Sequence, residues 1–297
     1  MTTDALPLPL SPTVEEAYTF CRTITHRYGA NFSVGFRFLP TPKRRAVYAA
    51  YAWCRWADDI ADEGILEGGN TERMRQLDSW QRELDACYAG HPTHPITIAL
   101  GDTLAAFAIP KAAFVALIDG CRQDMVKTRY ETFDELLGYC DLVASSISDI
   151  SLAIFGYKTE AALAYGRNLS TALQLTNVTR DVGEDIGRDR IYVPRQELER
   201  FGVSEAELVA LRPTENLRRL IEFQIERAEG YFRRAEPLIT ELSFDARFPT
   251  LLMGGVYATV LQRLRLDPLV VLHHRMRLNK FEKLAVIARR LVRPHFI

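Results

Sequence analysis

The sequence lacks most features that mark secreted, membrane-spanning or nucleic-acid-binding proteins. Its 37 Lys and Arg residues balance 38 Asp and Glu, and a net charge of −1 gives no bulk attraction to nucleic acid. No apolar run approaches the roughly 18 residues of a membrane-spanning helix, and the opening MTTDALPLPLSP has no basic start typical of a signal peptide. Five cysteines, an odd number, argue against a disulfide framework. We therefore expect a cytoplasmic protein, with residues 1–12 disordered.

Two common nucleotide-binding patterns are also missing, because the sequence contains neither a G-x-G-x-x-G fingerprint nor a P-loop. Apolar residues recur with helical spacing almost throughout, and no alternating strand pattern is found. No linker is rich enough in Pro or Gly to divide the chain. We therefore predict one all-α domain over residues 1–297, with serines at 145–148 bending one helix. The predicted helices cover residues 13–28, 41–62, 72–89, 95–107, 111–128, 132–155, 159–185, 214–241, 246–266 and 280–292.

Two acidic helical segments carry most of the functional information. Residues 58–62 read DDIAD and residues 181–185 read DVGED, so each contains two aspartates four positions apart. Residues with this spacing lie on one face of a helix, one turn apart. Mg²⁺ takes a few carboxylates and completes its shell with water and substrate phosphates, and Mn²⁺ is an alternative. Two such carboxylate pairs, facing each other across a helical bundle, would suit an enzyme that handles a diphosphate.

Each acidic pair continues a polar stripe on an otherwise apolar helix. A lone D-x-x-x-D usually marks a solvated helix face, but two matching stripes favour a buried polar site, because unpaired polar groups are costly to bury. The first stripe consists of Tyr51, Arg55, Asp58 and Asp62, and the second of Gln174, Asn177, Asp181 and Asp185.

Three other motifs in the sequence are less informative than these stripes. The second acidic segment does not match a calcium-binding EF-hand, which needs ligands at alternate positions and a closing Glu. Residues 58–62 also form a literal D-D-x-x-D, the motif of head-to-tail prenyl synthases and terpene cyclases, but the second segment lacks the partner motifs of those enzymes. His91 and His94 have zinc-ligand spacing without a further ligand nearby, which favours a surface loop.

The segments YAAYAWCRWADDIADE and LQLTNVTRDVGEDIGRDRIYVP closely resemble the two signatures of the squalene/phytoene synthase family. The resemblance extends from about residue 17 to about residue 285. It implies a single all-α bundle with a central cavity, and an enzyme that joins two prenyl diphosphates head to head. In that chemistry one allylic diphosphate ionises, the double bond of the second substrate attacks, and loss of a proton closes a cyclopropane intermediate.

The resemblance also implies a role for individual residues of this chain. The metal ligands would be Asp58, Asp62, Asn177, Asp181 and Asp185. Phosphate oxygens would be neutralised by Arg55, Arg180, Arg190 and Arg275, since the fork of a guanidinium suits that task. The reacting carbons would face Tyr51, Gln174 and Tyr257, which together with Arg55 form the expected catalytic set. The hydrocarbon pocket would be lined by Phe32 and Phe36, for which ordinary core packing is the alternative.

Two departures from the family pattern bear on the length of the substrate. Many members carry Y-C-Y-x-V-A-G-T-V-G, whereas residues 139–148 read YCDLVASSIS, and residues 31–34 read NFSV where many phytoene synthases have small hydroxyl residues and a Tyr. Both resemble bacterial squalene synthases of the hopanoid pathway. We therefore favour farnesyl diphosphate and a C30 product, presqualene diphosphate or squalene, over geranylgeranyl diphosphate and phytoene. Use of NADPH and the oligomeric state stay open.

A non-enzyme alternative is a helical scaffold that has lost catalysis, but retention of all four metal-site aspartates argues against it.

The C-terminal region differs in charge from the rest of the chain. Residues 263–297 hold nine Arg or Lys against one Asp and one Glu, and Phe281, Leu284, Ile287 and Leu291 recur at helical spacing. This pattern is typical of a basic amphipathic helix that lies on an anionic membrane surface. We therefore expect peripheral contact with the inner face of the membrane. The alternative is a terminal helix docked on the bundle with its charges in solvent.

Overall fold

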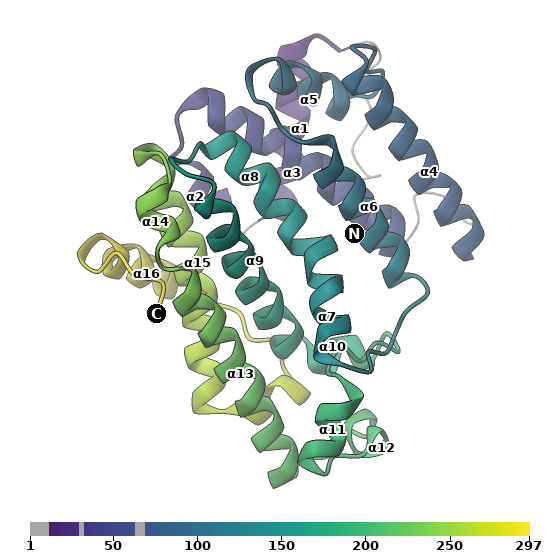
Figure 1. Ribbon diagram of the computed structural model, residues 1–297, viewed down its shortest axis with the longest axis vertical. Coiled ribbons are helices and arrows are strands. Elements are labelled where there is room, and N and C mark those ends of the chain that lie inside the picture. The colour runs from purple at the N-terminus through teal and green to yellow at the C-terminus, as the bar shows by residue number, and fades with distance from the viewer. Residues whose placement is uncertain (1–11, 30–32, 63–68) are drawn as a thin grey trace. The chain divides into compact units, whose positions relative to one another are not determined.

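The computed structural model describes residues 12–29, 33–62 and 69–297 (Figure 1). Within these ranges the regular structure is helical apart from two isolated β-bridges, so the predicted all-α fold is confirmed. The residues group into two compact units. Unit 1 comprises residues 1–126, 146–158 and 242–249, and unit 2 comprises residues 127–145, 159–241 and 250–297. The single domain expected over residues 1–297 stays a prediction.

Unit 1 is built around one long helix, α3 (Thr41–Asp62), which packs against most of the other helices of the unit. The face of α3 turned to these neighbours is apolar, with Ala49, Trp53 and Ile60 fully or almost fully buried. Burial of this face supplies the hydrophobic free energy that fixes how α3 is rotated about its axis. The other helices of unit 1 are α1 (Val14–Tyr28), α2 (Ser33–Phe36), α4 (Gly69–Tyr88), α5 (Pro95–Ala106), α6 (Lys111–Asp124), α8 (Ser146–Phe155) and the first turn of α15 (Phe244–Leu266).

Unit 2 is organised around α9 (Ala161–Arg180) and α13 (Glu215–Ala235), which pack along each other (Figure 1). The short 3-10 helix η3 (Pro268–Leu272) contacts both α13 and α10 (Val182–Ile186). The remaining elements are α7 (Phe133–Cys140), the π-helix η2 (Asp141–Ser145), α11 (Arg195–Phe201), α12 (Glu205–Val209), α14 (Leu238–Glu241), the rest of α15, and α16 (Lys280–Val292).

Most helices begin and end close to the predicted positions, and those over 41–62 and 280–292 match at both ends. The prediction of one helix over 159–185 is wrong, because the backbone leaves α geometry at Asp181 (φ −98°, ψ 10°) and α10 starts at the next residue. The helix predicted to reach residue 241 ends at Ala235, because Pro237 has no N–H that could continue the helical hydrogen bonds. The short helices α2, α11 and α12 were not predicted.

The serine-rich interruption takes the form of a π-helix over residues 141–145, in which Ser145 donates a hydrogen bond to Asp141 (2.9 Å).

The helical stretch over 133–155 is also the one segment of the described chain that is long and apolar enough to cross a membrane. Its most apolar window of 18 residues has a mean hydropathy of 1.3, and 44% of that window is buried within the protein. Core helices meet the same criterion, so the segment is weak evidence for a membrane span.

His91 and His94 lie in a loop, as predicted, and His91 is exposed, but the side chain of His94 is half-buried. His94 is the N-cap of α5, and its Nδ1 accepts a hydrogen bond from the Ile96 backbone N–H (3.2 Å). Its ring centroid lies 4.8 Å from that of Trp56 and 5.0 Å from that of Trp80. Burial lowers the pKa of His94 to about 4, and the nearby Glu83 opposes this shift. A neutral imidazole with an accepting Nδ1 is therefore part of the local fold.

Candidate functional site

The first polar stripe lies on the solvent-exposed face of α3. Tyr51 and Arg55 are partly exposed and Asp58 and Asp62 are exposed, whereas Trp53 on the opposite side is fully buried. The rotation of α3 fixed by its apolar face therefore presents both predicted metal-binding carboxylates, one turn apart, to solvent. These residues form the part of the candidate site that belongs to unit 1.

The Asp58 side chain is exposed to solvent on one side, and protein atoms surround its carboxyl group densely on the other sides. Removal of water by this packing raises the pKa of Asp58 to about 7, and the negative charges of Asp62 and Asp59 act in the same direction. Arg55 opposes the shift, and the thiol of Cys121 lies 3.6 Å from Asp58 Oδ1. A divalent cation bound by this carboxyl group would stabilise its charged form.

Arg55 has a partner that the sequence reasoning did not assign. Its guanidinium forms an ion pair with Asp59, whose side chain is only 2% exposed, and lies 5.2 Å from the ring centroid of Tyr28. A buried carboxylate on one side and an aromatic face on the other restrict the arginine to one orientation. The spacing of four residues between Arg55 and Asp59 was the available signal in the sequence.

Tyr51 lies against the end of α1. A Cβ placed on Gly29 would be 3.1 Å from Tyr51 Cζ and 3.2 Å from its hydroxyl, so the ring needs the space that a glycine leaves. Burial raises the pKa of Tyr51 well above its usual range. The tyrosine is therefore a neutral phenol at physiological pH.

Of the two phenylalanines predicted to line a hydrocarbon pocket, Phe32 lies outside the described residues. Phe36 ends the short helix α2 and is partly exposed. Its ring meets that of Tyr48 edge to face, with centroids 6.4 Å apart. This contact places Phe36 against α3, the helix that carries the first polar stripe.

The second polar stripe keeps helical spacing across the break at Asp181. The Asp181 N–H donates to the Asn177 carbonyl and the Asp185 N–H donates to the Asp181 carbonyl, each at 2.9 Å. Gln174 stands one turn earlier and accepts a weak hydrogen bond from Asn177 Nδ2 (3.4 Å). The four predicted residues of this stripe are thus brought together on successive turns of unit 2.

Asn177 carries an oxygen without a hydrogen-bond partner. Its Oδ1 is buried and accepts no hydrogen bond from any part of the chain that the structure describes. A buried unsatisfied amide oxygen costs free energy in a folded protein. Carboxamide and carboxylate oxygens are ligands that hard divalent cations accept, so this atom fits the predicted role of Asn177.

Two arginines hold the Asp181 carboxylate. Arg180 donates from Nε to Oδ1 (2.6 Å) and from Nη2 to Oδ2 (2.5 Å), while Nε and Nη2 of Arg275 each lie 3.1 Å from an Asp181 oxygen. Arg275 also pairs with Glu184 at 3.0 Å. Both guanidiniums are thus concentrated beside one acidic group, where an incoming diphosphate would find two preoriented forks.

Tyr257 lies beside this cluster and is buried. Burial raises the pKa of Tyr257, whereas the charge of Arg180 and a hydrogen bond from Asn177 lower it. The structure thus brings together Tyr257, Arg180 and Asn177 in unit 2.

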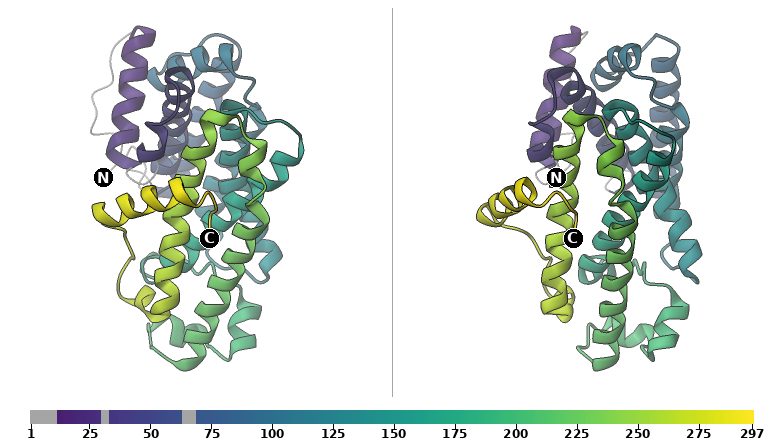
Figure 2. Two further views of the ribbon diagram at one scale, coloured as in Figure 1. Left: turned by 90° about the vertical axis from the view of Figure 1, so that its left-hand side faces the viewer. Right: turned by 60° about the vertical axis from the view of Figure 1, so that its left-hand side comes forward.

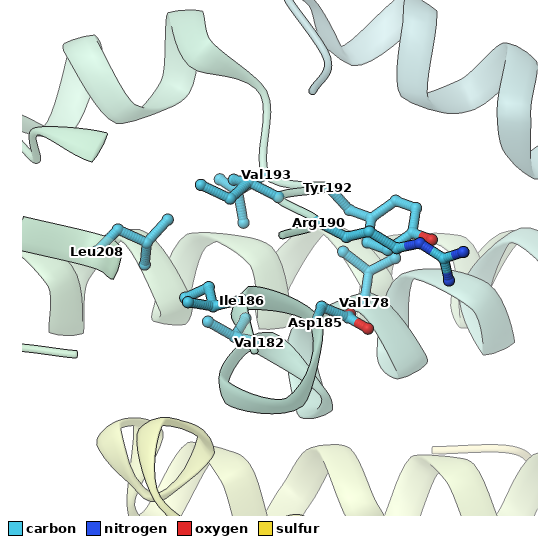
Figure 3. A pocket seen from close by; sticks show the side chains of 9 residues that line it. Val178, Val182, Asp185, Ile186, Arg190, Tyr192, Val193 and Leu208 are labelled. Carbon is cyan, nitrogen blue, oxygen red and sulfur yellow. The ribbon is translucent and has the colours of Figure 1, made fainter. Parts of the chain in front are cut away.

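Asp185 and Arg190 line a small pocket of unit 2 (Figure 3). The carboxylate of Asp185 and the guanidinium of Arg190 lie at the same end of the pocket, with Tyr192 beside the arginine. The other end is apolar and includes Leu208. The Arg190 N–H also donates to the Asp185 carbonyl (2.8 Å), which ties the arginine to the acidic turn.

The loop that carries Arg190 is anchored by Arg129, a residue that the sequence reasoning missed. Arg129 donates to the carbonyl of Asp189 (2.6 Å) and to its carboxylate (2.7 Å). Asp189 has a positive φ of 56°, and the Ile191 N–H continues the anchor by donating to the Thr128 carbonyl (2.9 Å). Arg129 and Asp189 are 60 positions apart in the sequence, so no local signal indicated this pairing.

The donor set fits Mg²⁺ bound largely by water and phosphate. Nowhere in the described ranges do three His, Cys, Asp or Glu side chains converge on one point, so no all-protein metal cage is formed there. Each polar stripe instead offers two carboxylates one turn apart, and the second stripe adds the Asn177 oxygen that accepts no hydrogen bond within the described residues. Mg²⁺ is usually held by one or two carboxylates together with substrate phosphates. The expectation that the two acidic pairs face each other stays a prediction.

Comparison with known proteins identifies the family. The model of the family described as squalene/phytoene synthase matches residues 25–282. A phytoene synthase of Arthrospira platensis is 36% identical over 289 residues, covering 92% of this chain and 91% of its own. A 15-cis-phytoene synthase of Synechocystis is 40% identical over 252 residues, which cover 80% of this chain and 73% of that protein.

Solved structures of similar proteins share the fold. The squalene synthase HpnC from Alicyclobacillus acidocaldarius superposes with a TM-score of 0.80 at 32% identity, covering 86% of this chain and 95% of its own. A dehydrosqualene synthase in complex with a ligand gives a TM-score of 0.87 at 26% identity, and the match covers 94% of this chain and 96% of that one. The similarity therefore extends over nearly the whole chain.

Proposed function

The chain belongs to the squalene/phytoene synthase family, and on that premise we propose that it joins two prenyl diphosphates head to head in a Mg²⁺-dependent reaction. It is a prenyltransferase-type enzyme of isoprenoid biosynthesis. The observation that carries the proposal is the cluster of Arg180, Arg275 and Asp181, in which two guanidinium forks converge on one carboxylate. Such a cluster is suited to exchange the carboxylate for a diphosphate.

We assign binding of the diphosphates to the two polar stripes. Asp58 and Asp62 on one stripe, and Asn177, Asp181 and Asp185 on the other, would hold Mg²⁺, with Mn²⁺ as an alternative. When bound, the metal stabilises the negative charge that develops on the departing diphosphate. Phosphate oxygens would be bound and oriented by Arg55, Arg180, Arg190 and Arg275.

We assign protection of the carbocation to neutral polar groups near the reacting carbons. The raised pKa values of Tyr51 and Tyr257 keep both as phenols. A phenol presents its π-face to a cation, whereas a phenolate oxygen would trap it covalently. Gln174, which is uncharged, is placed in the same group.

Two substrate lengths are candidates, and each is favoured by one observation. The departures at residues 139–148 and 31–34 favour farnesyl diphosphate and a C30 product of the presqualene diphosphate or squalene type, as in hopanoid biosynthesis. The identities of 36% and 40% to phytoene synthases favour geranylgeranyl diphosphate and phytoene equally well. Because substrate and product are hydrocarbon chains, we place the enzyme in the cytoplasm, in peripheral contact with the inner face of the membrane.

The test is product identification. The purified protein is incubated with farnesyl or geranylgeranyl diphosphate, with and without Mg²⁺ and NADPH, and the extracted lipids are identified by mass spectrometry. A Mg²⁺-dependent C30 or C40 head-to-head product is expected. Release of diphosphate without such a product would instead support a terpene cyclase, and absence of any turnover with either substrate would support a scaffold that has lost catalysis.

A further inference from the structure

The C-terminal helix α16 is attached to unit 2 through one defined side. Its first turn is closed by a capping box, in which the Glu282 N–H donates to Asn279 Oδ1 (3.0 Å) and the Asn279 N–H donates to Glu282 Oε2 (2.6 Å). Glu282 also forms an ion pair with Arg263 of α15. In both views of Figure 2 the C-terminal end of α16 lies beside α15, while its N-terminal end points away from it.

The buried side of α16 rests on a glycine of α15. Val286 and Arg290 are the buried residues of the helix. A Cβ on Gly255 would lie 2.5 Å from Arg290 Nε and 3.2 Å from Val286 Cγ1, so the helix approaches α15 as closely as glycine permits. Arg290 donates to the carbonyls of His295 and Phe296, and Phe296 is fully buried. These contacts determine which face of α16 points outward.

The outward face is apolar. Phe281 is 82% exposed, Leu284 59%, Leu291 68% and Val292 80%. At 3.6 residues per turn these four, together with Ala285 and Ala288, fall within an arc of about 120°. Among the described residues twelve large apolar side chains are exposed, and five of them lie between residues 281 and 297. Such concentration on one face marks an interaction surface rather than scattered exposure.

Basic residues border this apolar arc. On a helical projection Lys280 lies just beyond one edge and Arg289 just beyond the other, with Arg293 farther along the second side, and all three are exposed. Residues 280–297 contain five Lys or Arg and one Glu, although the whole chain has a net charge of −1. This surface therefore complements a partner with an apolar interior, which would contact the apolar arc, and a negatively charged surface, which would contact the basic residues.

An anionic lipid bilayer has these properties. An amphipathic helix with an apolar face and basic flanks lies in the headgroup region with its apolar side chains at the acyl boundary. Pairing with α16 of a second copy is disfavoured, because the basic edges of both copies would be brought together. We propose that the outward face of α16 docks the protein on an anionic membrane. Phe281, Leu284 and Leu291 enter the interface, while Lys280, Arg289 and Arg293 bind lipid phosphates.

The experiment measures vesicle co-sedimentation of the full chain without any prenyl substrate, so its outcome is independent of the proposed reaction. Vesicles contain phosphatidylcholine alone or with one third phosphatidylglycerol, at low and at high salt. Binding to the anionic vesicles at low salt, weakened by salt, is expected. The triple variant Lys280→Gln, Arg289→Gln and Arg293→Gln should lose roughly 100-fold in affinity for these vesicles.

A second triple variant, Phe281→Ser, Leu284→Ser and Leu291→Ser, should lose more than about 10-fold in affinity, because less apolar area is buried in the interface. The matched control is Phe244→Ser with Leu266→Ser, two side chains that are 86% and 85% exposed elsewhere in the chain, and it should bind as the parent does. All altered residues are exposed, so circular dichroism and turnover of detergent-dispersed substrate should stay unchanged.

Three results would overturn the proposal. The first is absence of binding to anionic vesicles at low salt. The second is binding that survives the apolar triple variant. The third is dimerisation in solution that this variant abolishes, which would assign the face to a second copy.

Discussion

Arg275 and Asp181 are 94 residues apart in the sequence, and two nitrogens of the Arg275 guanidinium each lie 3.1 Å from an oxygen of the Asp181 carboxylate. Arg275 follows η3, and η3 packs against α10, the helix that starts directly after Asp181. The backbone contact between these two short elements therefore sets the position of a guanidinium in the candidate site. Gly183 is the residue that permits this contact.

We predict that Gly183→Ala lowers both stability and affinity for the diphosphate. A Cβ at this position would lie 2.8 Å from the Leu272 carbonyl oxygen and 2.9 Å from that of Val271, and backbone atoms cannot move aside cheaply. The expected loss in the free energy of unfolding is about 1–3 kcal/mol. The KM for prenyl diphosphate should rise as Arg275 is displaced. Urea unfolding and steady-state kinetics measure the two effects.

The matched control for this change is Gly138→Ala in α7, where a Cβ would meet nothing within 4 Å. Alanine is a better helix former than glycine, so this variant should be neutral or slightly stabilising. Gly183→Ala with parental stability and KM would show that η3 and α10 are not in tight contact.

Asp58→Asn and Asp185→Asn should each abolish turnover while the fold is retained. Loss of one anionic ligand removes several kcal/mol of stabilisation from a metal-bound diphosphate, which is at least about 100-fold in rate. Because the pKa of Asp58 is raised to about 7, its charged form is disfavoured by the fold, and the neutral Asn should not destabilise the protein near neutral pH. Product formation at saturating Mg²⁺ and thermal unfolding measure these outcomes.

The control for the carboxylate variants is Asp78→Asn, which removes an exposed surface ion pair with Arg122. Near-parental product formation by either Asp58→Asn or Asp185→Asn would remove that residue from the metal site.

The predictable part of the site follows from spacing along single helices. The stripe that holds Tyr51, Arg55 and Asp58 is fixed by the 3.6-residue period and by the apolar residues opposite, and both can be read from the sequence. The all-α fold could be predicted for the same reason. The ion pair of Arg55 and Asp59 follows the same local rule but was overlooked.

The unpredicted part depends on backbone irregularities and contacts distant in sequence. The helix break at Asp181 leaves the acidic spacing intact but separates α9 from α10, and no residue pattern distinguishes it from a continuous helix. The anchor of Arg129 on Asp189 and the pairing of Arg275 with Asp181 require tertiary packing. Propensities and periodicity carry no information about such pairs.

Phe36→Ala is predicted to raise the use of C20 relative to C15 diphosphate. The Phe36 ring stands against Tyr48 of α3, and its removal would lengthen a hydrocarbon pocket beside that helix. Selectivity in apolar pockets changes by about 10-fold for such a change in volume. Phe32→Ala, outside the described residues, is expected to act in the same direction. Competition assays with both substrates measure the ratio.

Phe38→Ala is the control for chain length, since Phe38 is half exposed and packs on Phe248, with ring centroids 4.9 Å apart. An unchanged C20 to C15 ratio in both Phe36→Ala and Phe32→Ala would show that these residues do not set the substrate length and serve only in core packing.

The stability of the protein should fall as the pH is lowered from about 6.5 towards 4, because His94 is held neutral in the folded state. Its pKa is about 4 in the fold and near 6.5 when unfolded, so the unfolded chain binds the extra proton throughout this window. The contribution is fully present above pH 6.5 and amounts to roughly 3 kcal/mol. His94→Asn keeps an N-cap acceptor without a titrating ring and should flatten the pH dependence of the urea midpoint. His91→Asn alters the exposed neighbour and should leave the dependence as in the parent protein. A parental slope in His94→Asn would show that other groups govern acid stability.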